Sequence, residues 1–168
     1  MAMSSEKQAS GQENLLLDYM HRLEKHKEGR KVVHLHLSEL RPMNRRDQHI
    51  RTAASNFDSL VTALDAQVFT VKNSDIFVIY KDTTHHQVET SVQQVRYLFD
   101  DDPLVAEEQH SEQKFATWYD AEKDFDTVLQ TVQNMAQAER KRQTEVRGRM
   151  DARAALKAKQ EKGEPLTP

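Results

Sequence analysis

A chain of 168 residues has room for one domain with extensions at its ends, because domains cluster near about 100 to 150 residues. It is 37% hydrophobic and 30% charged, with a formal net charge of −3, a composition that excludes disorder throughout the chain. The absence of cysteine excludes disulfides, thiolate metal sites and a cysteine nucleophile.

The N-terminal part of the chain predicts a helix followed by a strand. Residues 1–13 are rich in Ser, Gln and Glu, and we expect them to be disordered. From residue 14 to about residue 27 apolar side chains recur at the spacing of one helical face, and Gly29 would end that helix. The segment KVVHLHLSEL at 31–40 alternates as a strand does, with His34 and His36 on one side and Pro42 as its end.

The middle of the chain predicts a helix, a hairpin and a second helix. The apolar residues of 45–64 form one stripe, which is typical of a single amphipathic helix. AQVFTV at 66–71 and DIFVIY at 75–80 are rich in β-branched and aromatic residues and flank a polar turn, so they predict a hairpin. Apolar residues across 88–99 mark the next helix, which begins at Thr83 or Thr84 and ends at the segment DDDP.

The C-terminal part predicts a short strand, KFATWYD at 114–120, and a long helix that opens at about Asp120. Beyond residue 138 the apolar stripe thins, so we expect a charged helical extension or linker at 139–168. This extension holds nine Lys and Arg against five Asp and Glu, and any attraction to polyanions therefore belongs to it. The part between, 14–138, is predicted to be one α+β domain with flanking helices.

The order of the core elements, β-α-β-β-α-β, predicts the fold class. It is the order of the split βαβ, ferredoxin-like fold, an α+β arrangement in which two helices cover one face of an antiparallel sheet. Here a flanking N-terminal helix and a long C-terminal helix would be added to it. This fold serves many functions, so the function must be argued from particular residues.

Two segments of this core resemble a known family. VVHLHLSELRPMNRRDQHIRTAASNF at 32–57 contains the first strand and its helix, and VFTVKNSDIFVIY at 68–80 contains the hairpin. Together they resemble the GGDEF domain, the diguanylate cyclase fold of bacterial cyclic-di-GMP signalling, over residues 30 to 120. The resemblance implies that Asn44 takes the guanine-contacting position, that His49 and Phe77 match a His and the final Phe of the family pattern, and that Arg41 stands in for its Lys.

The same comparison of patterns implies that cyclase activity is lost. The position of the metal-binding Asp holds His36, the next acidic position holds Ser38, and the second guanine-contacting Asp is Ala53. In the hairpin turn Asp75 remains, but both glycines are replaced and the catalytic acid becomes Ile76. Because the reaction needs two Mg²⁺-class ions held by carboxylates, we expect no catalytic residues, no cofactor and no enzymatic activity.

Five residues remain as candidates for a ligand-binding site without chemistry: Arg41, Asn44, Arg45, His49 and Asp75. Guanidinium groups bind phosphates through paired hydrogen bonds, which suits a nucleotide. The favoured interpretation of the arginines, however, is a cluster that is solvated or paired within the chain.

His34 and His36 raise the separate question of a metal site. Two imidazoles on one strand face, joined by a third ligand from elsewhere, would suit Zn²⁺. Histidines on the less apolar face of a strand usually remain half exposed without a metal, so we expect none here.

The leading hypothesis is a non-catalytic regulatory or protein-interaction domain in bacterial signalling of the cyclic-di-GMP type. Its partner would be another protein or a further domain of the same chain, or a second copy bound through the terminal helices. The alternative is a nucleotide-binding sensor that retains a GTP or cyclic-di-GMP site.

A second alternative is an RNA-binding module of the same fold, in which Phe69 and Phe77 would stack on bases. The part of the chain before the extension is acidic overall, which argues against nucleic acid. We expect a terminal helix to cover these two rings instead.

The location of the protein is predicted from two absences in the sequence. No apolar stretch reaches the roughly 20 residues that span a bilayer. The start, MAMSSEKQASGQEN, lacks the apolar centre of a secretory signal. We therefore expect a cytoplasmic protein without membrane contact.

Overall fold

A four-stranded antiparallel sheet forms the centre of the computed structural model, which describes residues 11–106 and 114–161. The strands are β1 (Arg30–Leu35), β2 (Gln67–Thr70), β3 (Ile76–Lys81) and β4 (Ala116–Asp120). They lie in the order β2-β3-β1-β4, and each neighbouring pair is antiparallel. The expected α+β class with an antiparallel sheet is therefore confirmed.

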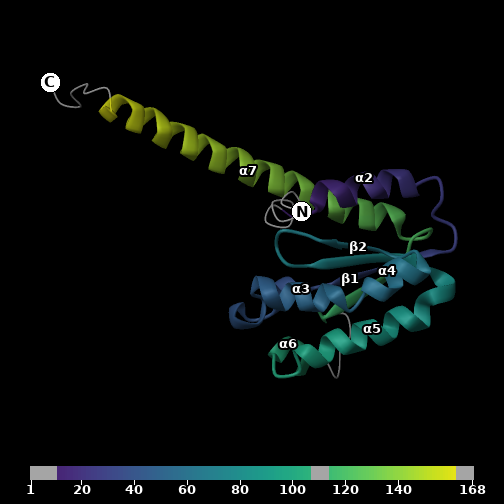
Figure 1. The fold of residues 1–168 in the computed structure, drawn as a ribbon. Helices are drawn as coiled ribbons and strands as arrows, with labels where there is room; N and C mark the ends of the chain where they lie inside the picture. Colours follow the sequence, from purple (N-terminus) through teal and green to yellow (C-terminus); the bar gives the residue numbers. More distant parts are fainter. Residues whose placement is uncertain (1–10, 107–113, 162–168) are drawn as a thin grey trace.

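Helices cover both faces of the sheet (Figure 1). The described α-helices are α2 (Glu13–Leu23), α3 (Asp47–Ser55), α4 (Asp58–Leu64), α5 (His85–Leu98), α6 (Pro103–Ala106) and α7 (Phe125–Glu161). Short 3-10 turns occur at Leu37–Glu39, Pro42–Asn44 and Asp82–Thr84. Helices α3, α4 and α5 lie on one side of the sheet, and α2 with the first half of α7 lies on the other. The expected N-terminal and long C-terminal helices are thus present.

The alternation of side chains along the strands divides the core in two. On β1, Val33 and Leu35 join the cluster beneath α3, α4 and α5, whereas Val32 joins the cluster beneath α2 and α7. On β3, which is buried on both faces from Ile76 to Tyr80, alternate residues do the same. A strand buried on both faces needs an uninterrupted apolar run, which is what IFVIY supplies.

The two candidate base-stacking rings lie under the terminal helices. Phe77 is fully buried and Phe69 is 9% exposed, and both belong to the cluster formed with α2 and α7. The expectation that a terminal helix covers these rings is therefore confirmed.

The single helix predicted at 45–64 is instead two helices, α3 and α4, separated at Asn56 and Phe57. The side-chain amide of Asn56 donates to the carbonyl oxygens of Thr52 and Ala53, at 3.0 and 3.3 Å. Asn side chains that bond nearby carbonyls compete with the helical backbone pattern. The apolar stripe nevertheless continues across the break, because Ile50, Ala53, Phe57 and Leu60 are all buried.

The first strand is shorter than predicted, since β1 ends at Leu35 and not before Pro42. Leu37 and Leu40 are both buried, and the N–H of Leu40 bonds the carbonyl oxygen of Leu37 across a 3-10 turn. A spacing of three residues places both side chains on one side of such a turn. The turn therefore buries a pair that a continued strand would direct to opposite faces.

Helix α7 begins at Phe125, slightly later than predicted, and continues without interruption through the described part of the extension. Phe125, Val128 and Val132 are buried against the sheet, but from residue 140 to residue 159 only Val146 is even partly buried. Figure 1 shows this second half projecting from the body. The residues predicted to be disordered at the start lie mostly outside the described residues, apart from Gly11, Gln12 and Glu13, which begin the described chain.

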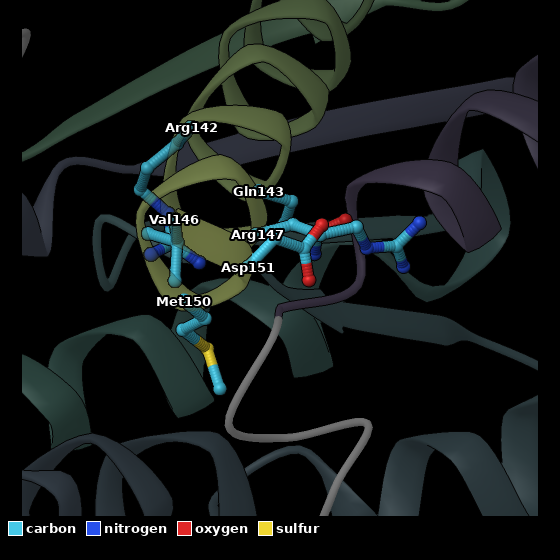
Figure 2. A pocket seen from close by; sticks show the side chains of 6 residues that line it. All are labelled: Arg142, Gln143, Val146, Arg147, Met150 and Asp151. Carbon is cyan, nitrogen blue, oxygen red and sulfur yellow. The ribbon is translucent and has the colours of Figure 1, made fainter. Parts of the chain in front are cut away.

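The projecting half carries a shallow hollow of about 300 Å³, lined by residues of α7 alone. Figure 2 shows the lining side chains Arg142, Gln143, Val146, Arg147, Met150 and Asp151 around a single helix. Within the described residues, no helix is both long and apolar enough to cross a membrane.

Candidate functional site

The turn between β2 and β3 is a closed bend that presents Asp75 at the start of β3. The N–H of Val71 bonds the carbonyl oxygen of Asp75, and the N–H of Ser74 bonds that of Val71, both at 3.0 Å. Ser74 has a φ of +87°, a conformation that favours glycine. The side-chain oxygen of Asn73 accepts the N–H of Asp75 at 3.0 Å, as Asn often does in turns.

The carboxylate of Asp75 is buried and has two strong partners. Its Oδ2 lies 2.7 Å from Nε2 of His34, and its Oδ1 accepts the backbone N–H of Ser38 at 2.8 Å. Burial raises the pKa of Asp75, but the hydrogen bonds from His34 and Ser38 outweigh burial and hold that pKa below its ordinary value. Asp75 is therefore an ionised acceptor inside the protein, and His34 donates to it.

The two histidines lie against each other beside this carboxylate. Their ring centroids are 4.1 Å apart, and the ring of His34 stacks on Phe77 at 4.1 Å. Nε2 of His36 lies 2.6 Å from Oγ1 of Thr117 on β4. Burial and the neighbouring His34 lower the pKa of His36, outweighing the opposite effect of Asp75, so the neutral imidazole is favoured.

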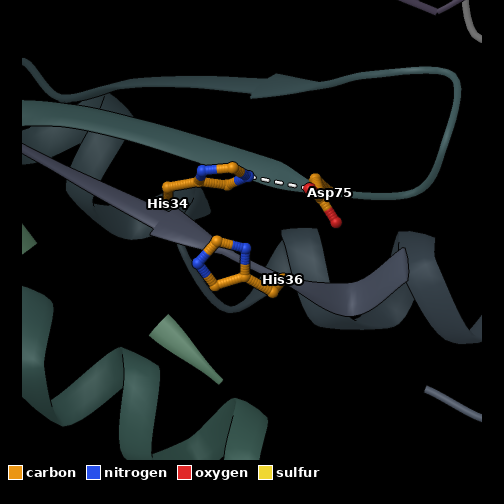
Figure 3. Close-up of side chains that lie close together, drawn as sticks. All are labelled: His34, His36 and Asp75. Atoms are coloured by element: carbon orange, nitrogen blue, oxygen red, sulfur yellow. Dashed lines mark hydrogen bonds and ion pairs between the residues drawn. The ribbon is translucent and has the colours of Figure 1, made fainter. Parts of the chain in front are cut away.

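His34, His36 and Asp75 together form a compact group of potential metal ligands (Figure 3). One ligand atom from each lies within 4.8 Å of the others, and within the described parts of the chain this is the one group of three found so close. The sequence placed His34 and His36 on one face, but it left the third ligand unidentified. The structure places Asp75 in that position.

A second polar centre forms around Asp102, directly before α6. Its carboxylate accepts the side-chain amide of Asn44 at 2.8 Å and the backbone N–H groups of Arg41 and Leu104 at 2.9 and 3.0 Å. Burial raises the pKa of Asp102, but these three hydrogen bonds outweigh burial and lower it. The amide of Asn44 is therefore bonded to Asp102 and not to the hairpin turn.

Sequence reasoning missed this role of Asp102, which it interpreted as part of a helix stop. A signal was present, because Asp before Pro103 is the pattern of an N-cap followed by proline in the first turn of a helix. Its bond to Asn44, 58 residues away in the chain, carried no such signal.

The remaining candidates lie in different surroundings. Arg45 is exposed and its guanidinium donates to the carbonyl oxygen of Ser38 at 3.2 Å, so Arg45 and Asp75 both contact Ser38. Nδ1 of His49 is buried and has no hydrogen-bond partner among the described residues. The structure thus links Arg45 with Asp75, and links Asn44 and the Arg41 backbone with Asp102.

A small hollow of about 60 Å³ lies between α5 and β4. Its lining consists of Glu89, Val92, Gln93, Arg96, Ala116 and Trp118. None of the five candidate ligand residues lines this hollow or the one along α7.

Comparisons of the chain with protein-family models, with curated proteins and with solved structures found no significant match. Any functional conclusion therefore depends on the residues and contacts of the chain itself.

Proposed function

We propose that the chain is a non-catalytic regulatory or interaction domain that acts through the projecting half of α7. The observation that carries this proposal is that residues 140–161 continue α7 away from the body. From residue 140 to residue 159 their side chains are exposed, apart from half-buried Val146. A helix that packs against nothing is only marginally stable in water, and most helices gain their stability from tertiary contacts. A partner that packs against this half would supply the missing contacts.

The chemistry of the projecting half suggests the kind of partner. Met150 and Leu156 are 65% and 50% exposed, and with Val146 they fall within an arc of about 120° around the helix. Residues 140–161 hold eight Lys and Arg against three Asp and Glu. A protein surface that is acidic and partly apolar would complement them.

A second copy of the chain would meet the charge part of this requirement. The formal net charge of the whole chain is −3 although its C-terminal part is basic, so the rest of the chain is strongly acidic. The body of one copy would therefore attract the projecting helix of another, in competition with other acidic partners.

We further propose that the domain is a degenerate, ferredoxin-like relative of GGDEF domains, with a role in bacterial cyclic-di-GMP-type signalling in the cytoplasm. Support comes from the strand order β2-β3-β1-β4, which suits a split βαβ core. Further support comes from the turn between β2 and β3, whose one carboxylate, Asp75, faces inward to His34 and Ser38.

Sedimentation velocity of the full chain over a range of concentrations, at low and high salt, tests the role of the helix. We expect concentration-dependent association that weakens with salt and is lost when Met150 and Leu156 are both replaced by Glu. Tyr97, which is 76% exposed on α5, gives the matched control, and Tyr97→Glu should associate like the unchanged chain. Association that survives the double substitution would contradict a role for this helix.

Calorimetric titration with GTP and with cyclic-di-GMP, in the presence of Mg²⁺, separates this proposal from the nucleotide sensor. We expect no binding heat with either ligand. Micromolar binding that disappears in Arg45→Ala would overturn the interaction proposal in favour of the sensor.

A further inference from the structure

We propose that His34, His36 and Asp75 form a binding site for a divalent transition-metal ion of the Zn²⁺ class. The three residues come from two neighbouring strands. His34 lies in β1, His36 directly follows it, and Asp75 directly precedes β3. Their side chains converge because β1 and β3 pair antiparallel, with His34 opposite Phe77 and Leu35 opposite Ile76. The next positions, His36 and Asp75, are two residues beyond the first of these pairs and so lie on the same face as His34.

The distances in this group suit a small ion after a minor adjustment. Zinc takes His nitrogen and carboxylate oxygen at about 2.0 to 2.2 Å, so two ligands of a tetrahedral ion lie about 3.3 Å apart. Here all three ligand atoms lie within 4.8 Å of one another, and His34 Nε2 and Asp75 Oδ2 lie 2.7 Å apart. The ion would replace the proton that now joins His34 to Asp75, and that proton would leave to solvent.

The groups behind these ligands already hold them in place. Oγ1 of Thr117 bonds Nε2 of His36, which leaves Nδ1 as the nitrogen available to an ion. Figure 3 shows one ring nitrogen of His36 on the side of the Asp75 carboxylate. The N–H of Ser38 bonds Oδ1 of Asp75, so Oδ2 is the oxygen that faces the histidines. Such outer partners orient metal ligands and raise metal affinity.

The ligand types determine the class of ion. Two imidazoles and one carboxylate suit Zn²⁺, Co²⁺, Ni²⁺ or Cu²⁺, whereas Mg²⁺ and Ca²⁺ take oxygen ligands almost exclusively. Three protein ligands leave a fourth position for water or for a ligand from another molecule. His36 is only half-buried, which gives an ion access to the group.

The test is metal titration of the full chain after treatment with a chelator. Co²⁺ binding is followed by its visible d–d absorption, and Zn²⁺ affinity is measured by competition with a chromophoric chelator. We expect one ion per chain and a Co²⁺ spectrum of low coordination number. Loss of an outer partner of a metal ligand already weakens metal affinity by about tenfold or more. His36→Gln removes a ligand itself, so it should weaken the affinity by at least about tenfold.

His86→Gln is the matched control, because His86 is an exposed histidine outside the group. It should bind Zn²⁺ as tightly as the unchanged chain. A chain that binds no ion at micromolar concentration, or a His36→Gln variant with unchanged affinity, would overturn the proposal.

Imidazole NMR signals of the unchanged chain provide a readout that does not depend on the folding of any variant. One equivalent of Zn²⁺ should shift the signals of His34 and His36 and leave those of His86 in place. Shifts confined to histidines outside the group would contradict the assignment.

Discussion

Replacement of Asp75 by Ala tests whether the buried pair with His34 stabilises the fold. The carboxylate accepts two hydrogen bonds, at 2.7 and 2.8 Å, and both partners are buried or partly buried. A hydrogen bond to a charged group contributes about 1.5 to 3 kcal/mol, and removal of the acceptor leaves two donors unsatisfied. We therefore expect Asp75→Ala to lower the free energy of unfolding by about 3 to 5 kcal/mol.

The assay is urea unfolding at neutral pH with a chelator present, so that metal binding does not contribute. Asp82→Ala is the control, because Asp82 is exposed and its 3.2 Å ion pair with Lys31 lies at the surface. Loss of such a pair costs at most about 1 kcal/mol. If Asp75→Ala and Asp82→Ala lose the same small amount, the reasoning about the buried pair is wrong.

The same comparison has a pH dependence of known sign. Because the folded-state pKa of Asp75 lies below its ordinary value, its contribution is complete above the ordinary carboxyl pKa. The contribution is lost as the pH falls through the lowered value. The difference in unfolding free energy between the unchanged chain and Asp75→Ala should therefore shrink in acid.

Three further changes test other parts of the structure. Asp102→Ala should lower the free energy of unfolding by about 2 kcal/mol or more, since three donors lose their acceptor, whereas the exposed neighbour in Asp101→Ala should lose little. Ser74→Gly should raise the free energy of unfolding by up to about 1 kcal/mol, because glycine adopts the positive φ without strain. The melting temperature should rise with it, and a lowered melting temperature would contradict this. Burial raises the pKa of Glu13, so the contribution of Glu13 to stability should fall as the pH rises from the ordinary carboxyl pKa through the raised value. Unfolding measured across that range should show the unchanged chain losing stability relative to Glu13→Gln, and a constant difference between the two would refute this assignment.

The element order and the burial pattern of this fold could be predicted from periodicity, but the breaks in its elements could not. The apolar stripe from Ile50 to Leu60 is continuous in the sequence, and it remains continuous in space across the end of α3. Periodicity reports which side chains are buried, and it is insensitive to a local side-chain bond such as that of Asn56 to Thr52. The early end of β1 could not be predicted for a related reason. Strand alternation predicts that Leu37 is buried, and Leu37 is also buried in the 3-10 turn that replaces the strand.

The candidate site could be predicted only as far as one strand extends. The alternation along β1 placed His34 and His36 on a common face, which the contact between their rings bears out. Their closeness to Asp75 depends on the register between β1 and β3, where a shift of one residue would send Asp75 to the opposite face. No local pattern in a single sequence specifies that register, and the same limit applies to the pairing of Asn44 with Asp102.

The continuity of α7 gives the molecule a lever arm. One continuous helix joins a half that is packed against the sheet, at Phe125, Val128 and Val132, to a half that extends about 33 Å beyond the body. A tilt of about 10° where the helix meets the sheet would carry its tip through roughly 6 Å. With the projecting half held helical by a partner, a small change of packing in the core would thus produce a larger displacement at the far end of the helix. Conversely, a force on the tip would act on the buried side chains of α2 and β3.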